Sequence, residues 1–202
     1  MMKSQILANA REAFGSHGYA ETSLRQIAEK VGIKTPSLYA HFPNKSALYE
    51  AVYNEVASEH SEFFGGLVDE TSDLTPLERL HALLSGIETY YRVRPDLADF
   101  SLRAAVAESH PSGHGLRRIF LDSESSLIFA VQQSFDDGVA SRQFAPGDTE
   151  EFSALFLMLM DGLFLQLTHY EPAVFRQRFE LAWRQLSRML VTTTWGEDHG
   201  DE

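Results

Sequence analysis

The sequence predicts an all-α protein in which an N-terminal three-helix unit, containing a helix-turn-helix, precedes a larger helical body. Apolar residues recur at helical spacing along nearly the whole chain. Within the first quarter, a glycine-containing turn separates two short helical segments. Beyond residue 45, proline, glycine and short polar segments divide the pattern into further helices. We therefore divide the chain into residues 1–46, residues 47–195 and an acidic tail at 196–202.

The second helix of the N-terminal unit follows an amphipathic first helix and begins after Thr22 and Ser23, whose hydroxyls are suited to an N-cap. Gly32 ends it, because a residue without Cβ accepts the left-handed backbone of a tight turn. Ile33 is then expected to pack the turn onto the core. The apolar face of this helix comprises Leu24, Ile27, Ala28 and Val31.

The third helix is short. We expect Thr35 to cap it and Pro36 to occupy its first position, where a missing N–H costs nothing. Leu38, Phe42 and Tyr39 are expected to anchor it to the core. The sequence therefore predicts a helix of about two turns that leaves its polar side chains outside.

Short or flat hydrogen-bonding groups crowd this third helix, namely Lys34, Thr35, Ser37, Tyr39 and His41. A recognition helix needs such groups to reach base edges and phosphates, whereas a purely structural hairpin more often carries Glu and Lys pairs. Beyond Pro43, Asn44 caps the next helix, and Lys45 lies in its first turn, where a basic side chain opposes the helix dipole. A DNA phosphate would offset that mismatch. The pattern favours DNA binding, with an ordinary helical hairpin as the alternative.

The segment IAEKVGIKTPSLYAHFPNKSAL resembles the DNA-binding signature of the tetracycline-repressor (TetR) family of bacterial regulators. The preceding helix, ending in Phe14, Gly18 and Tyr19, is consistent with this resemblance. Val31 and Pro36 depart from the family pattern, which often has Ala before the turn glycine and Gly or Ala at the later position. The matching residues are Ile27, Ala28, Gly32, Ile33, Leu38, Tyr39, His41, Phe42, Lys45 and Leu48.

The resemblance implies a homodimeric regulator that binds double-stranded operator DNA and is controlled by a small-molecule effector inside the larger domain. We expect Thr35, Ser37 and Tyr39 to contact the operator from the recognition helix, which also contains Lys34 and Pro36. Phosphate contacts are expected from Arg25, His41 and Lys45. No cofactor is expected. The sequence does not identify the effector, the operator, or whether the protein represses or activates.

Charge is unevenly distributed along the 202 residues, whose formal net charge is −12. Residues 1–50 hold six basic and four acidic side chains, so the remainder of the chain carries −14. An acidic body behind a mildly basic head would favour one orientation on DNA. The chain has no cysteine and no recognisable secretion signal, and we expect no window long enough to span a membrane. These features predict a cytoplasmic protein without membrane contact.

Helices of the body are expected over residues 45–70, 75–94, 96–109, 115–137, 152–167 and 171–192. Thr75 and Glu78 form a capping box at the start of the second of these. The loop HPSGHG at residues 110–115 is the flexible stretch of the body. Residues 152–167 are apolar almost all round the helix, so burial on every side is expected. A second subunit packed against the last two helices would provide it.

Metal and catalytic sites are poorly supported. Glu78 and His81 have the spacing of a di-iron ligand pair, but no second pair is present. His110 and His114 lie in a loop, which loses helical His-His geometry. No serine lies on a recognisable nucleophile elbow. We therefore expect no metal and no catalytic residue, and keep a helical enzyme or small-molecule carrier as the alternative function.

The effector pocket is harder to predict, because aromatic residues at helical spacing usually fill the core. Arg103 lies on a small, apolar helix and could meet an anion, while Asp161 interrupts the most apolar segment and needs a partner. We expect a mostly apolar effector with one polar or anionic group. The candidate lining residues are Tyr90, Phe100, Arg103, Phe120, Phe129, Phe156, Met160, Asp161 and Phe164.

Overall fold

The computed structural model describes residues 2–106 and 113–191, and over these residues all regular secondary structure is helical. This confirms the predicted all-α class. Within these residues, the one β-type pairing is an isolated antiparallel bridge between Phe144 and Val191. The helices are α1 Met2–Glu21, α2 Leu24–Val31, α3 Thr35–Tyr39, α4 Lys45–Glu70, α5 Pro76–Arg92, α6 Pro95–Val106, α7 Gly113–Ala140, α8 Thr149–His169 and α9 Pro172–Leu190.

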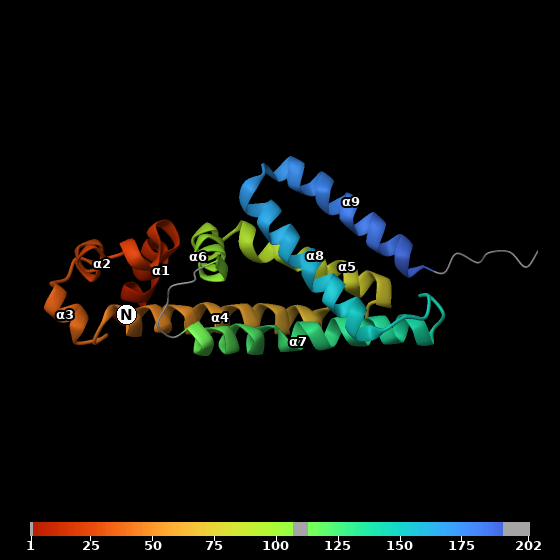
Figure 1. Ribbon diagram of the computed structural model, residues 1–202, viewed down its shortest axis with the longest axis horizontal. Helices are drawn as coiled ribbons and strands as arrows, with labels where there is room; N and C mark the ends of the chain where they lie inside the picture. The colour runs from red at the N-terminus through yellow and green to blue at the C-terminus, as the bar shows by residue number, and fades with distance from the viewer. Residues whose placement is uncertain (1, 107–112, 192–202) are drawn as a thin grey trace, which may run out of the picture.

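The molecule is elongated, with α1, α2 and α3 forming a head at one end (Figure 1). Helix α4 runs from this head along the length of the body beside α7, and α6 lies against α1. Helix α8 packs on α5 and α7, and α9 covers α8 at the side away from α4. The boundary at residues 46 and 47 therefore falls inside a continuous helix, and head and body share α4.

The head has its own apolar core, but the body contributes to it. Ile6, Phe14 and Leu38 are buried in this core together with residues of α2 and α4. Phe100 of α6 and Leu116 of α7 belong to the same cluster. Gly15 of α1 allows α6 to approach, since a Cβ at that position would lie 3.0 Å from the backbone nitrogen of Phe100. A movement of α6 therefore reaches the packing of the head directly.

Capping signals located several helix ends correctly. The side chain of Asn44 accepts a hydrogen bond from the N–H of Ala47 at 2.8 Å, and α4 begins at the next residue, as predicted. The carboxylate of Glu78 accepts from both the N–H and the hydroxyl of Thr75, which confirms the capping box. The predicted ends of the later helices are less accurate, and the Asp148 cap of α8 was not identified from the sequence.

Helix α8 is longer than predicted, since it begins at Thr149, behind the Asp148 cap, and ends at His169. Its 21 residues are long and apolar enough to cross a membrane by length and composition, so the expectation that no window reaches this length is wrong. A core helix of a water-soluble protein passes the same test. Only 28% of the apolar window is buried within this chain, however, so the contacts of this chain do not bury the helix on every side.

Some predicted features cannot be compared with the structure. Residues 110–112 and the acidic tail lie outside the described residues, as does the side chain of His114. The second half of the predicted loop, residues 113–115, is helical at the start of α7, so the loop prediction is wrong there. Glu78 serves as a helix cap, and the ring of His81 packs on Phe179 and Trp183. No cluster of metal-ligating side chains occurs in the described ranges.

Candidate nucleic-acid interface and effector cavity

The helix-turn-helix is held by local hydrogen bonds that its sequence specifies. Ser23 caps α2 and forms a reciprocal capping box with Gln26. Gly32 has a left-handed backbone, with φ 80° and ψ 27°, and its N–H donates to the carbonyls of Ala28 and Glu29. The N–H of Ile33 donates to the carbonyl of Ala28 at 2.9 Å. The turn thus fixes the angle between α2 and α3, as predicted.

Helix α3 begins at Thr35, one position earlier than predicted. Lys34 is the N-cap residue, its backbone is extended, and Thr35 is already helical. The hydroxyl of Thr35 therefore makes no capping hydrogen bond, and the prediction of a Thr35 cap is wrong. The start is still set by Pro36, which stands in the first turn, where its missing N–H has no intrahelical partner to lose.

The polar side chains of α3 are turned outward from two buried anchors. Leu38 and Phe42 are buried, whereas 51% of Tyr39 is exposed, so Tyr39 is not an anchor. The remaining predicted contact residues are exposed except Thr35, which is half-buried; they are Arg25, Lys34, Pro36, Ser37 and His41. Arg25 donates a hydrogen bond to Glu29 one turn later at 2.8 Å. The head therefore presents a polar surface at the tip of the molecule.

Lys45 contacts protein where a phosphate was expected. Its ammonium group donates to the backbone carbonyls of Tyr19, Ala20 and Thr22 at 2.8 to 3.0 Å, and it lies 4.6 Å from the ring centre of Tyr19. These carbonyls belong to the last residues of α1 and to Thr22 after it, beyond Gly18, where φ 79° and ψ 171° interrupt the helical backbone and leave carbonyls without helical partners. The mismatch between Lys45 and the start of α4 is therefore offset within the head, by the end of another helix.

Arg103 has a similar role on the other side of α1. Its Nε donates to the carbonyl of Gly15 at 2.9 Å, and its Nη2 donates to that of Ser16 at 3.0 Å. The guanidinium group thus joins α6 to α1, outside the cavity described below. The prediction that Arg103 meets an effector anion is contradicted by this position.

A cavity of about 440 Å³ lies between α4, α5, α6 and α7, next to the head. Its size is within the range of small-molecule sites. Most of its wall is aromatic or aliphatic, and its polar members are hydroxyl groups and one imidazole. The lining residues are Tyr49, Tyr53, Val56, Ala57, His60, Tyr91, Phe100, Ser101, Ala104, Ala105, Leu116, Phe120 and Ser123.

Of the predicted pocket residues, only Phe100 and Phe120 line this cavity. Tyr90, Phe156 and Met160 are buried in the body core, and the ring of Phe164 packs at a tilt against that of the cavity residue Tyr91, with 4.5 Å between the ring centres. Phe129 and Asp161 do not line the cavity because both are exposed at the surface. The ring of Phe129 is 60% exposed, and Asp161 lies at the surface of α8, where partial burial of its carboxyl raises the pKa.

Polar groups gather at one side of the cavity. The imidazole of His60 is buried, and its Nδ1 lies 3.4 Å from the hydroxyl of Ser123. Burial lowers the pKa of His60 to about 4, so the ring is neutral at pH 7. Next to Ser123, Glu124 is buried behind the cavity wall, where burial and the nearby carboxyl of Asp161 raise its pKa to about 7. No lining residue carries a positive charge.

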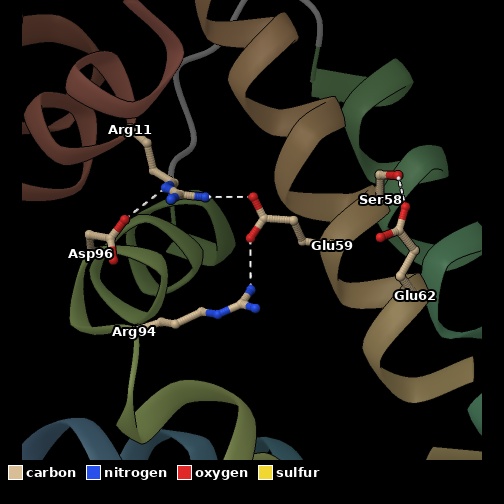
Figure 2. Close-up of polar contacts among 6 residues, drawn as sticks. All are labelled: Arg11, Ser58, Glu59, Glu62, Arg94 and Asp96. Atoms are coloured by element: carbon tan, nitrogen blue, oxygen red, sulfur yellow. Dashed lines mark hydrogen bonds and ion pairs between the residues drawn. The ribbon is translucent and has the colours of Figure 1, made fainter. Parts of the chain in front are cut away.

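Four charged residues join the head to this region (Figure 2). Arg11 of α1 donates from Nη1 to Glu59 of α4 at 2.8 Å, and its Nε forms an ion pair with Asp96 of α6 at 2.8 Å, without the alignment of a hydrogen bond. Arg94, just before α6, donates to the other carboxylate oxygen of Glu59 at 2.8 Å. We call this group, Arg11, Glu59, Arg94 and Asp96, the ion clasp. It ties three helices that meet beside the cavity.

The cavity face of α4 was not predicted from the sequence, although its residues carry a recognisable pattern. Tyr49, Tyr53, Val56 and His60 recur at three- and four-residue intervals, which places them on one face of the helix. Two hydroxyl groups from other helices complete the site, those of Ser101 and Ser123. A stripe that mixes tyrosine and histidine differs from the purely aliphatic stripe of an ordinary core helix.

Sequence comparison relates the chain to bacterial regulators. A family model described as bacterial regulatory proteins, tetR family, matches residues 6–52, the head and the start of α4. The transcriptional repressor AcnR of Corynebacterium diphtheriae is 29% identical over 174 residues, covering 81% of this chain and 92% of that protein. The transcriptional repressor ComR of Escherichia coli is 48% identical over 50 residues, which are a quarter of each chain.

Solved structures show the same fold over the full length. FadR of Bacillus subtilis, solved in complex with stearoyl-CoA, has a TM-score of 0.71 at 17% identity and covers 92% of this chain and 98% of its own. The ketosteroid regulator KstR2 of Mycobacterium tuberculosis has a TM-score of 0.69 at 19% identity, covering 95% and 96%. These structures show the fold, and the family match over residues 6–52 together with the similarity to named repressors assigns the chain to the tetR family of bacterial regulatory proteins, DNA-binding transcriptional regulators that are not enzymes.

Proposed function

We propose that this regulator is a cytoplasmic, homodimeric repressor that binds a pseudo-palindromic operator and is released from it by a small molecule. The observation that carries the proposal is the exposed polar face of α3, held at the tip of the molecule by the buried anchors Leu38 and Phe42. Residues 1–46 form the DNA-binding unit in this proposal, and residues 47–195 form the unit for effector binding and dimerisation. The names of the relatives AcnR and ComR support repression.

The operator contacts are proposed for side chains of the head that are exposed or half-buried. Thr35, Ser37 and Tyr39 are assigned to the major groove, where hydroxyl groups read base edges. Phosphate contacts are assigned to Arg25 and His41, together with Lys34 at the start of α3, because these side chains are exposed. Lys45 is reassigned, since its ammonium group already donates to three carbonyls; we propose that it positions α4 on α1.

The effector is proposed to occupy the cavity. Tyr49 and Phe100 both line it and also belong to the core of the head, so a molecule placed there touches the packing that orients α3. A ligand shifts a conformational equilibrium only by its difference in affinity for the two states. About 1.4 kcal/mol of that difference lowers operator affinity tenfold. The names of FadR and KstR2 support small-molecule control in proteins of this fold.

Dimerisation is proposed through α8 and α9. Both helices expose large apolar side chains, including Met158, Leu165, Leu181 and Met189, which a partner would cover. Asp161 in the middle of α8, and the packing of α8 on α5, α7 and α9, favour a protein partner over a lipid bilayer.

The decisive experiment is a footprint on the DNA upstream of the protein's own gene. We expect protection of two half-sites about one helical turn apart, because two heads of a symmetric dimer enter successive major grooves. A Ser37→Ala, Tyr39→Ala double variant should lose this protection while keeping its helical content. Equal protection by the variant and the parent protein would contradict the assignment of α3 to base contacts.

A further inference from the structure

We propose that the cavity takes an uncharged, mainly apolar molecule, a phenol or an alcohol, whose hydroxyl group donates a hydrogen bond to Nε2 of His60. This inference rests on the proposed function only in treating the cavity as the effector site. It replaces the anionic group expected from the sequence, because the arginine on which that expectation depended is engaged with α1.

The contacts of His60 with Ser123 favour one placement of the ring proton. The hydroxyl of Ser123 donates its one proton to the carbonyl of Phe120 at 2.7 Å. Its oxygen, 3.4 Å from Nδ1 of His60, can therefore only accept from that nitrogen. In a neutral imidazole with the proton on Nδ1, the other nitrogen has a free lone pair. Nε2 of His60 is accordingly a hydrogen-bond acceptor.

Nothing else in the described residues satisfies this acceptor. The ring of His60 packs among the rings of Phe64, Tyr90 and Phe120, with centroid distances of 4.6, 5.6 and 6.4 Å. No hydrogen bond to Nε2 is recorded over the described ranges. Since His60 lines the cavity, a molecule that brings a hydroxyl donor into this apolar space can form a hydrogen bond with Nε2.

The lining of the cavity disfavours a charged ligand, because it offers neither a positive group to an anion nor a negative group to a cation. None of the lining residues is cationic, and burial keeps His60 neutral at pH 7. Glu124 lies behind the cavity residues Tyr53 and Tyr91, and its carboxyl opposes a second negative charge there. Burying an unpaired charge costs far more than burying a hydroxyl group that is hydrogen-bonded.

The test uses four probes that share one biphenyl skeleton: para-phenylphenol, its methyl ether, para-phenylbenzoate and para-phenylbenzylamine. Titration calorimetry on the full-length protein at pH 7 should show the phenol binding about fivefold to tenfold more tightly than the ether, the ratio expected of one net hydrogen bond. The benzoate and the amine should bind more weakly than the ether. Equal or tighter binding of either ion, or no binding of any probe, would overturn the inference.

Two variants assign the preference to His60. His60→Leu removes the acceptor but keeps an apolar side chain, so the ratio of phenol to ether affinity should fall to about one. Ser123→Ala leaves the imidazole in place without its Nδ1 partner, and the ratio should fall by a smaller factor. His81→Leu is the matched control, since His81 packs on Phe179 and Trp183, away from the cavity. An unchanged ratio in both cavity variants would remove His60 from the site.

The assay contains no DNA, which separates this inference from the proposed function. If the phenol binds with the expected preference but leaves the operator footprint intact, the cavity chemistry stands and the proposed release mechanism fails. If the footprint is released by an anionic molecule that binds the parent protein and His60→Leu equally, the repressor function stands and the present inference fails.

Discussion

Lys34 and Lys45 differ in what their ammonium groups contact, and this predicts opposite consequences of removing them. Lys45→Met deletes three hydrogen bonds from a charged donor to the end of α1, so it should lower the free energy of unfolding by about 2 kcal/mol. Lys34 is exposed at the start of α3, and Lys34→Met should leave stability unchanged. Urea unfolding of both variants measures the difference.

Operator titration completes this comparison. Lys34→Met should weaken binding by a similar factor for every DNA sequence and should reduce the slope of log affinity against log salt by about one, as expected for one lost phosphate contact. A stable Lys45→Met variant with a reduced salt slope would restore Lys45 to the phosphate-binding set.

His60 and Glu124 predict opposing effects of pH on stability. Burial holds the pKa of His60 near 4, below its ordinary value of 6.5, so the unfolded chain binds the extra proton and stability falls as pH decreases between these values. Burial and Asp161 raise the pKa of Glu124 from 4.5 to about 7, so the folded chain binds the proton and stability falls as pH increases over that interval. The two contributions largely cancel between about pH 5 and pH 6.5.

Glu124→Gln removes the contribution of Glu124 to the pH dependence of stability. The variant should gain stability relative to the parent protein as pH rises from 5 to 7, by at most about 3 kcal/mol, since each pKa unit corresponds to about 1.4 kcal/mol. Urea midpoints of both proteins at pH 5, 6 and 7 measure the effect. A constant difference between the two proteins across these three values would mean that Glu124 titrates normally.

At the scale of helices, the ion clasp connects α1, α4 and the start of α6. Arg11 and Glu59 are mostly shielded, with 16% and 30% of their side chains exposed, so their interaction is stronger than that of a surface pair. A double-mutant cycle with Arg11→Met and Glu59→Gln should give a coupling energy of about 1 kcal/mol or more. Each single variant should also blunt the response of operator binding to the effector, because both remove the ion pair that ties α1 to α4 beside the cavity.

Ser58→Ala is the matched control for the clasp. Ser58 neighbours Glu59 but donates to Glu62 at 3.3 Å on an exposed face of α4 (Figure 2). Its removal should change neither stability nor the effector response beyond experimental error. A coupling energy near zero for Arg11 and Glu59 would show that the clasp does not stabilise the head against the body.

Features set by local signals could be predicted from the sequence, whereas features set by packing between distant helices could not. Ser23, Gly32 and Asn44 act on their own chain neighbours, so the helix-turn-helix was predictable to within one residue. The cavity is assembled from four helices, and periodicity within each helix does not say which buried face meets an empty volume. For the same reason, the partners of Lys45 and Arg103 were missed, since both reach the carbonyl end of a helix distant in sequence.

Across the whole molecule, the body is acidic, and many of its exposed large apolar side chains lie on α8 and α9. In Figure 1, α9 lies on the side of α8 away from α4. The head carries the excess of basic side chains at the opposite end. A dimer formed through α8 and α9 would leave both heads free and would keep the acidic bodies off the duplex except at the two tips. The arrangement is therefore consistent with the proposed operator geometry.

The choice of residues to test this dimer depends on exposure. Leu163 is buried in the body core and Phe164 packs on Tyr91, so a charge at either position would damage the subunit itself. Met158 of α8 and Leu181 of α9 are 64% and 54% exposed, and a charge there is harmless to a monomer but buried in the proposed interface.

Met158→Asp and Leu181→Asp should therefore sediment as folded monomers at concentrations where the parent protein is a dimer, and both should lose at least tenfold in operator affinity because the two heads are no longer joined. Leu74→Asp is the control, since Leu74 is 42% exposed in the turn between α4 and α5, and this variant should remain dimeric. Sedimentation velocity distinguishes the outcomes. If both interface variants remain dimers with unchanged thermal stability, the partner covers a different face, and the exposed side of α8 needs another explanation.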